Sequence, residues 1–316
     1  MKKHLFAVIY GLALTCFTVY SLLDTFVIAR VYDVPDQPDT YLMLQAPDAA
    51  SHTDTEISSL TDNETEAVTA AEPVVTDVSY DNGNITINVT EYRYNDTDVY
   101  VADVVLSSPE YLKTAFAKAT YGKNVTDKTS TTAEQNNAIL AINGDYYGAR
   151  ESGYVIRSGV LYRDRAKAGT EDLVIYNDGS VKIINESDIT AEDLLLSGAY
   201  NVLSFGPGLI SEGKITVTAS EEVSRAMASN PRTAIGVIDG LHYVFVVSDG
   251  RTEESEGLSL YELACFMKDL GCTTAYNLDG GGSSTMVFNG RLVNNPTTNG
   301  KRISERSVSD IVYIGY

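Results

Sequence analysis

Apolar side chains dominate the N-terminal region. Residues 5–23 form an almost unbroken apolar run, and a second apolar stretch, 26–28, follows Asp24. Such a run can cross a bilayer as a helix, and the two lysines ahead of it favour an orientation that leaves the rest of the chain outside. A cleaved signal peptide is the alternative, but no small-x-small pattern precedes Arg30. We therefore predict an uncleaved transmembrane anchor over residues 1–30, in a single-pass protein of the cell membrane with an extracytoplasmic C-terminal domain.

The next segment has the opposite character. Residues 31–77 contain eleven acidic residues, no lysine or arginine and few large apolar side chains. A segment of this composition buries too little apolar surface to offset the entropy cost of ordering it. We predict a disordered acidic linker that holds the domain away from the membrane, and one folded domain over residues 78–316.

Alternating apolar and polar positions return in the folded domain and indicate β-strands. The predicted strands are 84–89, 99–106 and 138–142, and hairpins are predicted over 155–162 and 173–184. A short helix is expected at 111–118. These elements predict an α+β fold with a mixed central sheet and peripheral hairpins.

The last third of the chain predicts a βαβ unit. A strand over 243–247 is followed by Ser259-x-x-Glu262, a capping-box pattern that opens a helix, and Gly271 stops that helix. A second strand covers 273–278. The two strands of such a unit run parallel and end on the same edge of a sheet, where pockets form.

Two acids follow these strands directly. Asp249 and Asp279 each come after an apolar run and beside glycines. We expect both to emerge on one rim of the sheet, on neighbouring or next-neighbouring strands. Asn143-Gly144-Asp145 also follows a strand and could meet them there.

Charge and residue inventory exclude several classes of function. The chain has a net charge of −20 and no basic patch, so nucleic-acid binding is excluded. Of three histidines, His242 is the one inside the predicted domain, which argues against a Ser-His-Asp triad and histidine-based zinc sites. The three cysteines show no metal-binding spacing.

The run from Asn277 to Thr285, Asn-Leu-Asp-Gly-Gly-Gly-Ser-Ser-Thr, is the densest local signal. Three successive glycines are costly to order, and their backbone N–H groups can cradle an anion. A plain tight turn is the alternative. The run lacks the lysine of a P-loop, so carboxylates, arginines, amides and hydroxyls remain. Two carboxyl groups suffice to cleave a glycosidic bond, and arginines suit a phosphate, although each acid could also be a solvated turn residue.

Six motifs in order resemble the phosphodiester glycosidase domain family, over about residues 80–316. The motifs are Asn143-Gly144-Asp145-Tyr146-Tyr147, Phe205-Gly206-Pro207, Asn230-Pro231-Arg232-Thr233-Ala234-Ile235-Gly236, Ser248-Asp249-Gly250-Arg251, the glycine run, and Glu305-Arg306-Ser307-Val308. That family includes N-acetylglucosamine-1-phosphodiester α-N-acetylglucosaminidases and bacterial proteins of exopolysaccharide biosynthesis. The anchor and the short C-terminal boundary are more similar to the bacterial members.

The resemblance implies hydrolysis of a sugar-1-phosphodiester on an extracytoplasmic glycan, cell-wall polymer or exopolysaccharide. It implies Asp279, Asp249 and Asp145 as catalytic candidates, with Asp145 the least secure. The implied substrate- and phosphate-binding residues are Asn143, Arg232, Arg251, Gly280, Gly281, Gly282, Ser283, Ser284 and Arg306. Arg232, Arg306 and the amides of the glycine loop would hold the phosphate, while Arg251 and Arg306 could instead be structural partners of the acids.

Phosphate is already a good leaving group, so one carboxylate that stabilises an oxocarbenium-like state could be enough. The motifs require no cofactor, and they leave room for a divalent cation near the acids. One alternative is a non-catalytic domain that binds phosphorylated glycan during polysaccharide export or assembly. Another is a metal-dependent phosphodiesterase that cuts the P–O bond on the other side.

Overall fold

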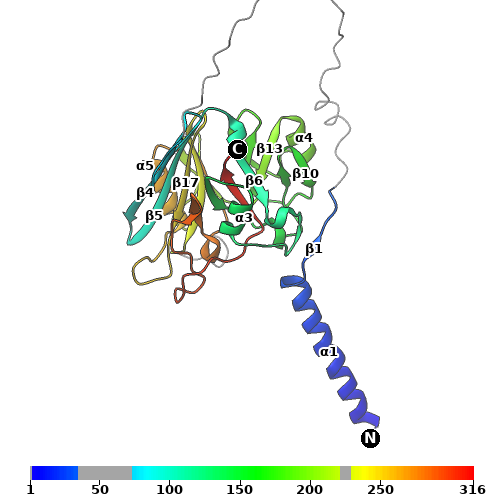
Figure 1. The fold of residues 1–316 in the computed structure, drawn as a ribbon. Helices are drawn as coiled ribbons and strands as arrows, with labels where there is room; N and C mark the ends of the chain where they lie inside the picture. Colours follow the sequence, from blue (N-terminus) through cyan, green and yellow to red (C-terminus); the bar gives the residue numbers. More distant parts are fainter. Residues whose placement is uncertain (1, 35–72, 221–228) are drawn as a thin grey trace, which may run out of the picture.

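The structure is a computed structural model that describes residues 2–34, 73–220 and 229–316 (Figure 1). The predicted linker lies mainly in 35–72, outside the described residues. Short strands lie at its two ends, β1 (Arg30–Val31) and β2 (Val74–Val75). Ordered chain therefore reaches into the predicted linker from both sides.

A nine-stranded sheet forms the centre of the domain. Its order is β15-β14-β18-β16-β17-β5-β4-β3-β2. After β2, the strands are β3 (Ser79–Asp81), β4 (Ile85–Tyr94), β5 (Thr97–Leu106), β14 (Gly208–Ser211), β15 (Lys214–Ile215), β16 (Arg232–Asp239), β17 (His242–Ser248) and β18 (Thr274–Asn277).

Two five-stranded sheets and a two-stranded one accompany it. The first five-stranded sheet contains β10 (Val160–Arg163), β9 (Val155–Arg157), β13 (Ala199–Leu203), β11 (Glu171–Tyr176) and β12 (Val181–Asn185). The second contains β20 (Arg291–Leu292), β19 (Met286–Phe288), β8 (Leu140–Asn143), β21 (Asp310–Ile314) and β6 (Leu112–Phe116). β1 pairs with β7 (Gly122–Lys123). The hairpins predicted over 155–162 and 173–184 are confirmed as β9–β10 and β11–β12.

Helices are few. The α-helices are α1 (Lys2–Phe26), α3 (Thr129–Gln135), α4 (Ala191–Leu196) and α5 (Leu260–Asp269), and the 3₁₀ turns are η1 (Pro109–Tyr111), η2 (Ala117–Ala119), η3 (Tyr147–Ala149) and η4 (Gly281–Ser283). The helix expected at 111–118 is wrong. Leu112 and Thr114 are buried on one face of β6, which pairs along its length with β21. A non-local pairing overrides the local helical preference there.

The α+β fold class is confirmed, and the βαβ unit is present with one strand inserted. β16 lies between β17 and β18 and runs antiparallel to both, so β17 and β18 are parallel. Directly paired strands are antiparallel throughout the described residues. In the expected mixed sheet, parallel strands such as β17 and β18 are therefore separated by an antiparallel strand.

Period-two alternation decides which side of the central sheet each residue covers. Tyr243, Phe245 and Val247 of β17 belong to the large core shared with the two five-stranded sheets. Val244 and Val246 belong to a second core beneath α5. The α5 capping box forms as predicted, between Ser259 and Glu262. These layers fix the strand ends at which the candidate site lies.

Candidate active site

Three strand ends meet at one rim of the central sheet. β16 begins at Arg232, opposite Ser248 at the end of β17. β18 lies on the other side of β16 and ends at Asn277. Asp249 and Asp279 follow these two ends and therefore share a rim, as predicted.

A cavity of about 150 Å³ opens at this rim. It is lined by Phe205, Asn230, Arg232, Arg251, Asn277, Leu278, Asp279, Gly280, Gly281 and Arg306. Among the described residues that line it, Asp279 is the one acid. Three arginines line the same cavity, so its charge suits an anion.

Asp279 is almost fully buried, at 8% exposed. Its Oδ2 accepts hydrogen bonds from Ser283 Oγ at 2.6 Å and from Arg306 Nη2 at 3.4 Å. Burial raises the pKa of Asp279, and the charge of Arg306 and then the Ser283 hydrogen bond oppose that rise. The carboxyl group therefore holds its proton more tightly than a solvent-exposed aspartate does.

Arg306 and Arg251 approach the cavity from two loops. Arg306 donates to Ser283 Oγ from Nε and Nη2, at 2.9 and 2.6 Å, and to Gly280 O at 3.1 Å. Arg251 donates to Asn230 Oδ1 and to the carbonyl of Thr298. Burial lowers the pKa of Arg251, and the nearby positive charge of Arg306 lowers it further. Two cations that repel each other across a cavity would be stabilised by an anion between them.

The third arginine is part of the sheet. Arg232 is 3% exposed at the start of β16, and its Nε donates to Leu258 O at 2.7 Å. Its position is fixed by the backbone hydrogen bond from its N–H to Ser248 Oγ. Arg232 is therefore a rigid positive charge at the floor of the cavity.

The glycine loop packs closely against its neighbours. The N–H groups of Gly281, Ser283 and Ser284 donate to backbone carbonyls, of Pro231, Gly280 and Gly281 respectively. The predicted anion cradle stays a prediction for the other amides of the loop. Close packing also requires glycine, because a Cβ on Gly280 would lie 2.8 Å from Pro231 O, and one on Gly282 would collide with Thr298 Oγ1. Gly281 also has a φ of 63°.

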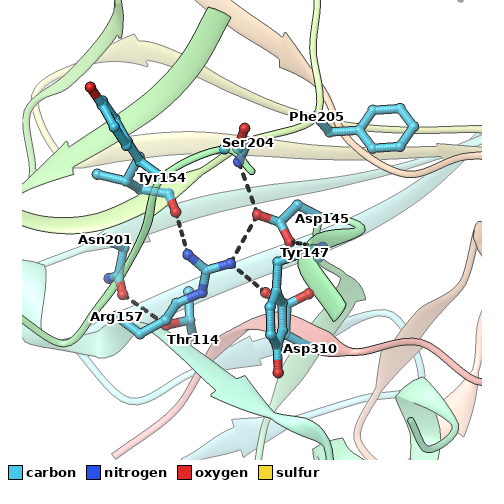
Figure 2. A network of polar contacts seen from close by, with 12 residues as sticks. Thr114, Asp145, Tyr147, Tyr154, Arg157, Asn201, Ser204, Phe205 and Asp310 are labelled. Carbon is cyan, nitrogen blue, oxygen red and sulfur yellow. Dashed lines mark hydrogen bonds and ion pairs between the residues drawn. The ribbon is translucent and has the colours of Figure 1, made fainter. Parts of the chain in front are cut away.

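Asp145 lies in a sealed network beside the cavity and does not line it (Figure 2). Its Oδ2 is 3.0 Å from Arg157 Nη2, which also reaches Asp310 Oδ2 at 2.7 Å. Asp145 also accepts hydrogen bonds from the N–H groups of Tyr147 and Ser204. Burial, and then the charge of Asp145, raise the pKa of Asp310 to about 8. Asp145 therefore pairs with a buried arginine outside the cavity lining, and its catalytic role stays a prediction.

Asp249 is also turned away from the cavity. Its Oδ1 accepts from Asn294 Nδ2 and Asn295 N, and its Oδ2 accepts from Asn295 Nδ2 at 3.0 Å. Asn294 also donates to Ser284 O. Asp249 therefore anchors the loop that packs behind the glycine run.

Asn143 and the serines have supporting positions. Asn143 Nδ2 donates to the Asp279 carbonyl at 2.6 Å, and its Oδ1 accepts from Thr233 Oγ1 at 2.8 Å. Ser283 bridges Asp279 and Arg306, while the buried Ser284 hydroxyl has no hydrogen-bond partner among the described residues. Asn143 thus fixes the backbone that carries Asp279.

Sequence reasoning missed six residues. Four of them line the cavity and stand inside quoted motifs, so neighbouring motif positions could have suggested them: Phe205, Asn230, Asn277 and Leu278. Arg157 and Asp310 are distant in sequence from every acid they contact, and no local pattern marks them. The described residues contain no group of three histidine, cysteine or acidic side chains arranged to hold a metal ion.

Comparison with known proteins identifies the family of this chain. The family model described as phosphodiester glycosidase matches residues 136–315. An uncharacterized SPβ prophage-derived protein of Bacillus subtilis, YomE, is 30% identical over 203 residues, which cover 62% of this chain and 31% of that protein. Human N-acetylglucosamine-1-phosphodiester α-N-acetylglucosaminidase is 34% identical over 108 residues, which cover 33% of this chain and 21% of that protein.

The fold has solved counterparts. The zebrafish N-acetylglucosamine-1-phosphodiester α-N-acetylglucosaminidase catalytic domain, auto-inhibited by its pro-peptide, superposes with a TM-score of 0.59 at 21% identity. The match covers 74% of this chain and 83% of that one. The chain itself spans only about a third or less of the length of the curated relatives it matches. The family match covers more than half of the sequence, and the chain therefore belongs to the phosphodiester glycosidase family.

Proposed function

We propose that the domain hydrolyses a sugar-1-phosphodiester by breaking the bond between the anomeric carbon and the phosphate oxygen. One observation carries this proposal: Asp279 shares a small cavity with Arg232, Arg251 and Arg306. The arrangement offers positive charge for a phosphate and one carboxylate beside it. Membership of the family supports the same reaction.

In this proposal the arginines bind the phosphate in the ground state and hold it as it leaves. The ionised Asp279 stabilises positive charge that develops on the sugar ring. Water adds its oxygen to the anomeric carbon and gives up a proton, and the phosphate leaves with the electrons of the broken C–O bond. A phosphate monoester is a stable anion, so its departure needs no second carboxyl group, consistent with Asp145 and Asp249 lying outside the cavity.

The proposed substrate is an extracytoplasmic glycan, such as a cell-wall polymer or an exopolysaccharide, that carries this linkage. Support comes from α1, whose residues Leu5–Phe26 are long and apolar enough to cross a membrane. In this proposal α1 is a retained single-pass anchor and the domain lies outside the cytoplasm.

A second candidate is a domain that binds phosphorylated glycan without cleaving it. The specific observation in its favour is that a single carboxylate, Asp279, lines the cavity among the described residues. Such a domain would keep its affinity for sugar-1-phosphates and release no sugar.

Release of reducing sugar from an N-acetylglucosamine-1-phosphodiester by the full chain distinguishes the two candidates. We expect turnover by the native chain and loss of turnover in Asp279→Asn, with an unchanged circular dichroism spectrum. Asp178→Asn is the matched control, because Asp178 is an acid before glycine in an exposed turn. Binding without turnover in the native chain would select the second candidate.

A further inference from the structure

The chain folds back onto the domain directly after α1. Arg30 and Val31 of β1 pair antiparallel with Lys123 and Gly122 of β7. The N–H of Tyr32 continues this contact by donating to Tyr121 O at 3.1 Å, and the two tyrosine rings lie 5.7 Å apart. The domain therefore contacts the segment that connects it to α1.

The side of the domain that receives this segment is shaped for it. Asn124 Nδ2 donates to the carbonyls of Thr25 and Ile28, at 3.2 and 3.1 Å. Thr25 is in the last turn of α1 and Ile28 lies two residues beyond its end, where carbonyls lack helical partners. Gly122 leaves the space in which Arg30 O lies, because any Cβ there would collide with that oxygen. The contact thus involves backbone pairing, side-chain capping and close packing together.

The same region leads directly to the candidate active site. Asp127 and Val308 exchange backbone hydrogen bonds at 3.0 and 2.7 Å. Ser130 donates to Glu305 from its N–H and its hydroxyl. Arg306 lies between these two attachment points, so the segment that holds the end of α1 also holds the loop of a cavity arginine.

A basic and apolar loop lies at this end of the domain. Lys301, Arg302 and Ile303 are consecutive and exposed, and the Ile303 side chain is 53% exposed. The loop is held through Thr298 O, which accepts from Arg251, so it adjoins the cavity. In Figure 1 the red-brown loop protrudes from the lower side of the domain, and α1 also leaves the domain on that side. Lysine, arginine and an exposed aliphatic side chain form a surface that suits anionic lipid headgroups.

We propose that this end of the domain lies on an anionic membrane surface, through the docked segment 24–32 and the loop 299–303. Three residues lie between Phe26 and Arg30, so the four Cα–Cα steps limit their separation to about 14 Å even when fully extended. The cavity that contains Arg306 is therefore held close to the lipid headgroups. Its substrates are groups presented at the bilayer surface.

The loop contact is tested in vesicles that contain the full chain with Cys16→Ser and Cys265→Ser. An environment-sensitive fluorophore is attached at Ile303→Cys in one sample and at Val105→Cys in the other. Val105 is similarly exposed, at 44%, and pairs with His242 at the opposite end of the central sheet from Asp249. With phosphatidylglycerol in the bilayer, a lipid-borne quencher should quench the label at 303 several-fold more than the label at 105. Equal quenching would overturn the proposal.

The charge in the loop is tested in the same labelled chain. Lys301→Gln with Arg302→Gln should reduce the quenching at 303, and so should replacing phosphatidylglycerol by phosphatidylcholine. Lys182→Gln, at an exposed lysine of β12, is the control and should change nothing. Unchanged quenching after loss of both loop charges would overturn the electrostatic part of the proposal.

Docking of the segment is tested by disulfide formation. Arg30→Cys with Lys123→Cys should cross-link rapidly under mild oxidation in vesicles, because these residues are cross-strand partners. Arg30→Cys with Val105→Cys should not. Equal rates for the two pairs, or removal of residues 1–26 from the mature protein, would overturn docking. None of these measurements depends on catalysis, so a failed hydrolysis assay leaves them interpretable.

Discussion

Two sets of arginines and aspartates lie side by side in this domain, and they differ in what surrounds them. Arg157 is buried between Asp145 and Asp310 and forms an ion pair with each of them (Figure 2). Asp279 and Arg306 meet at 3.4 Å on the wall of a cavity, where further positive charge faces them. The same residue types therefore stabilise the fold in one place and are available to a ligand in the other. Exposure to a cavity lined by three arginines and one acid marks the second set.

The largest expected effect tests the set of charged residues that lines the cavity, Asp279 and Arg306. Asp279→Asn should lower the rate of sugar release by about 10²–10⁴-fold, the range for loss of a catalytic carboxyl group. The native rate should fall as pH drops through the raised pKa of Asp279, since the ionised form is the active one. The free energy of unfolding should hold or rise, because a buried charge is removed. A chain that loses stability along with activity would place Asp279 with the structural set.

In the buried set, Arg157 with Asp145 and Asp310, a substitution should change stability rather than activity. Arg157→Leu leaves two buried carboxyl groups without their partner and should destabilise the fold by about 3–5 kcal/mol. Urea unfolding measures this. Arg157→Leu combined with Asp310→Asn removes one of the stranded charges and should recover part of the loss. If Arg157→Leu folds normally and loses only activity, the division between the two sets is wrong.

A smaller effect is expected at Arg251. Arg251→Gln removes one of the two cations that repel each other at the cavity and should weaken binding of a sugar-1-phosphate about 10-fold, equal to about 1.4 kcal/mol. Calorimetry measures the affinity directly. Arg291→Gln is the control, because Arg291 is an exposed arginine paired with Asp77 away from the cavity. Equal losses at both arginines would show general rather than local attraction.

The last prediction concerns a buried acid outside both sets, and its effect depends on pH. Asp172 is fully buried, neither of its carboxylate oxygens has a hydrogen-bond partner among the described residues, and burial raises its pKa to about 9. The folded state holds this proton more tightly than the unfolded state, so stability declines as pH rises from about 4 towards 9. Asp172→Asn should flatten that decline, by at most about 1.4 kcal/mol per pH unit. Urea unfolding at a series of pH values measures this. Parallel plots of the free energy of unfolding against pH for the native chain and the variant would show that Asp172 does not cause the decline.

The sequence predicts elements that local signals define. The Ser259 capping box, the βαβ order and the rim shared by Asp249 and Asp279 follow from short-range patterns, and all three are confirmed. Residues 111–118 show the limit of this reasoning, because pairing with β21 turned an expected helix into β6. Pairing between distant segments is not encoded in the periodicity of either one.

The site was predictable as a location and less so in its assignments. We expected three acids to face one cavity. The strand ends determine only the edge of the sheet at which each acid lies, and the partners of each side chain determine where it points. Asp145 turns towards Arg157 of β9, and Asp249 turns towards Asn294 and Asn295. Those partners come from loops and strands with no motif of their own, so the predicted set of catalytic candidates was larger than the set that lines the cavity.

The most direct test of the account is the fate of solvent oxygen during turnover of an N-acetylglucosamine-1-phosphodiester in water enriched in oxygen-18. We predict that mass spectrometry will find the label in the released sugar, and that Asp279→Asn will release neither labelled product. Label in the phosphate would show attack at phosphorus, and it would contradict cleavage of the sugar–oxygen bond at the Asp279–Arg306 cavity.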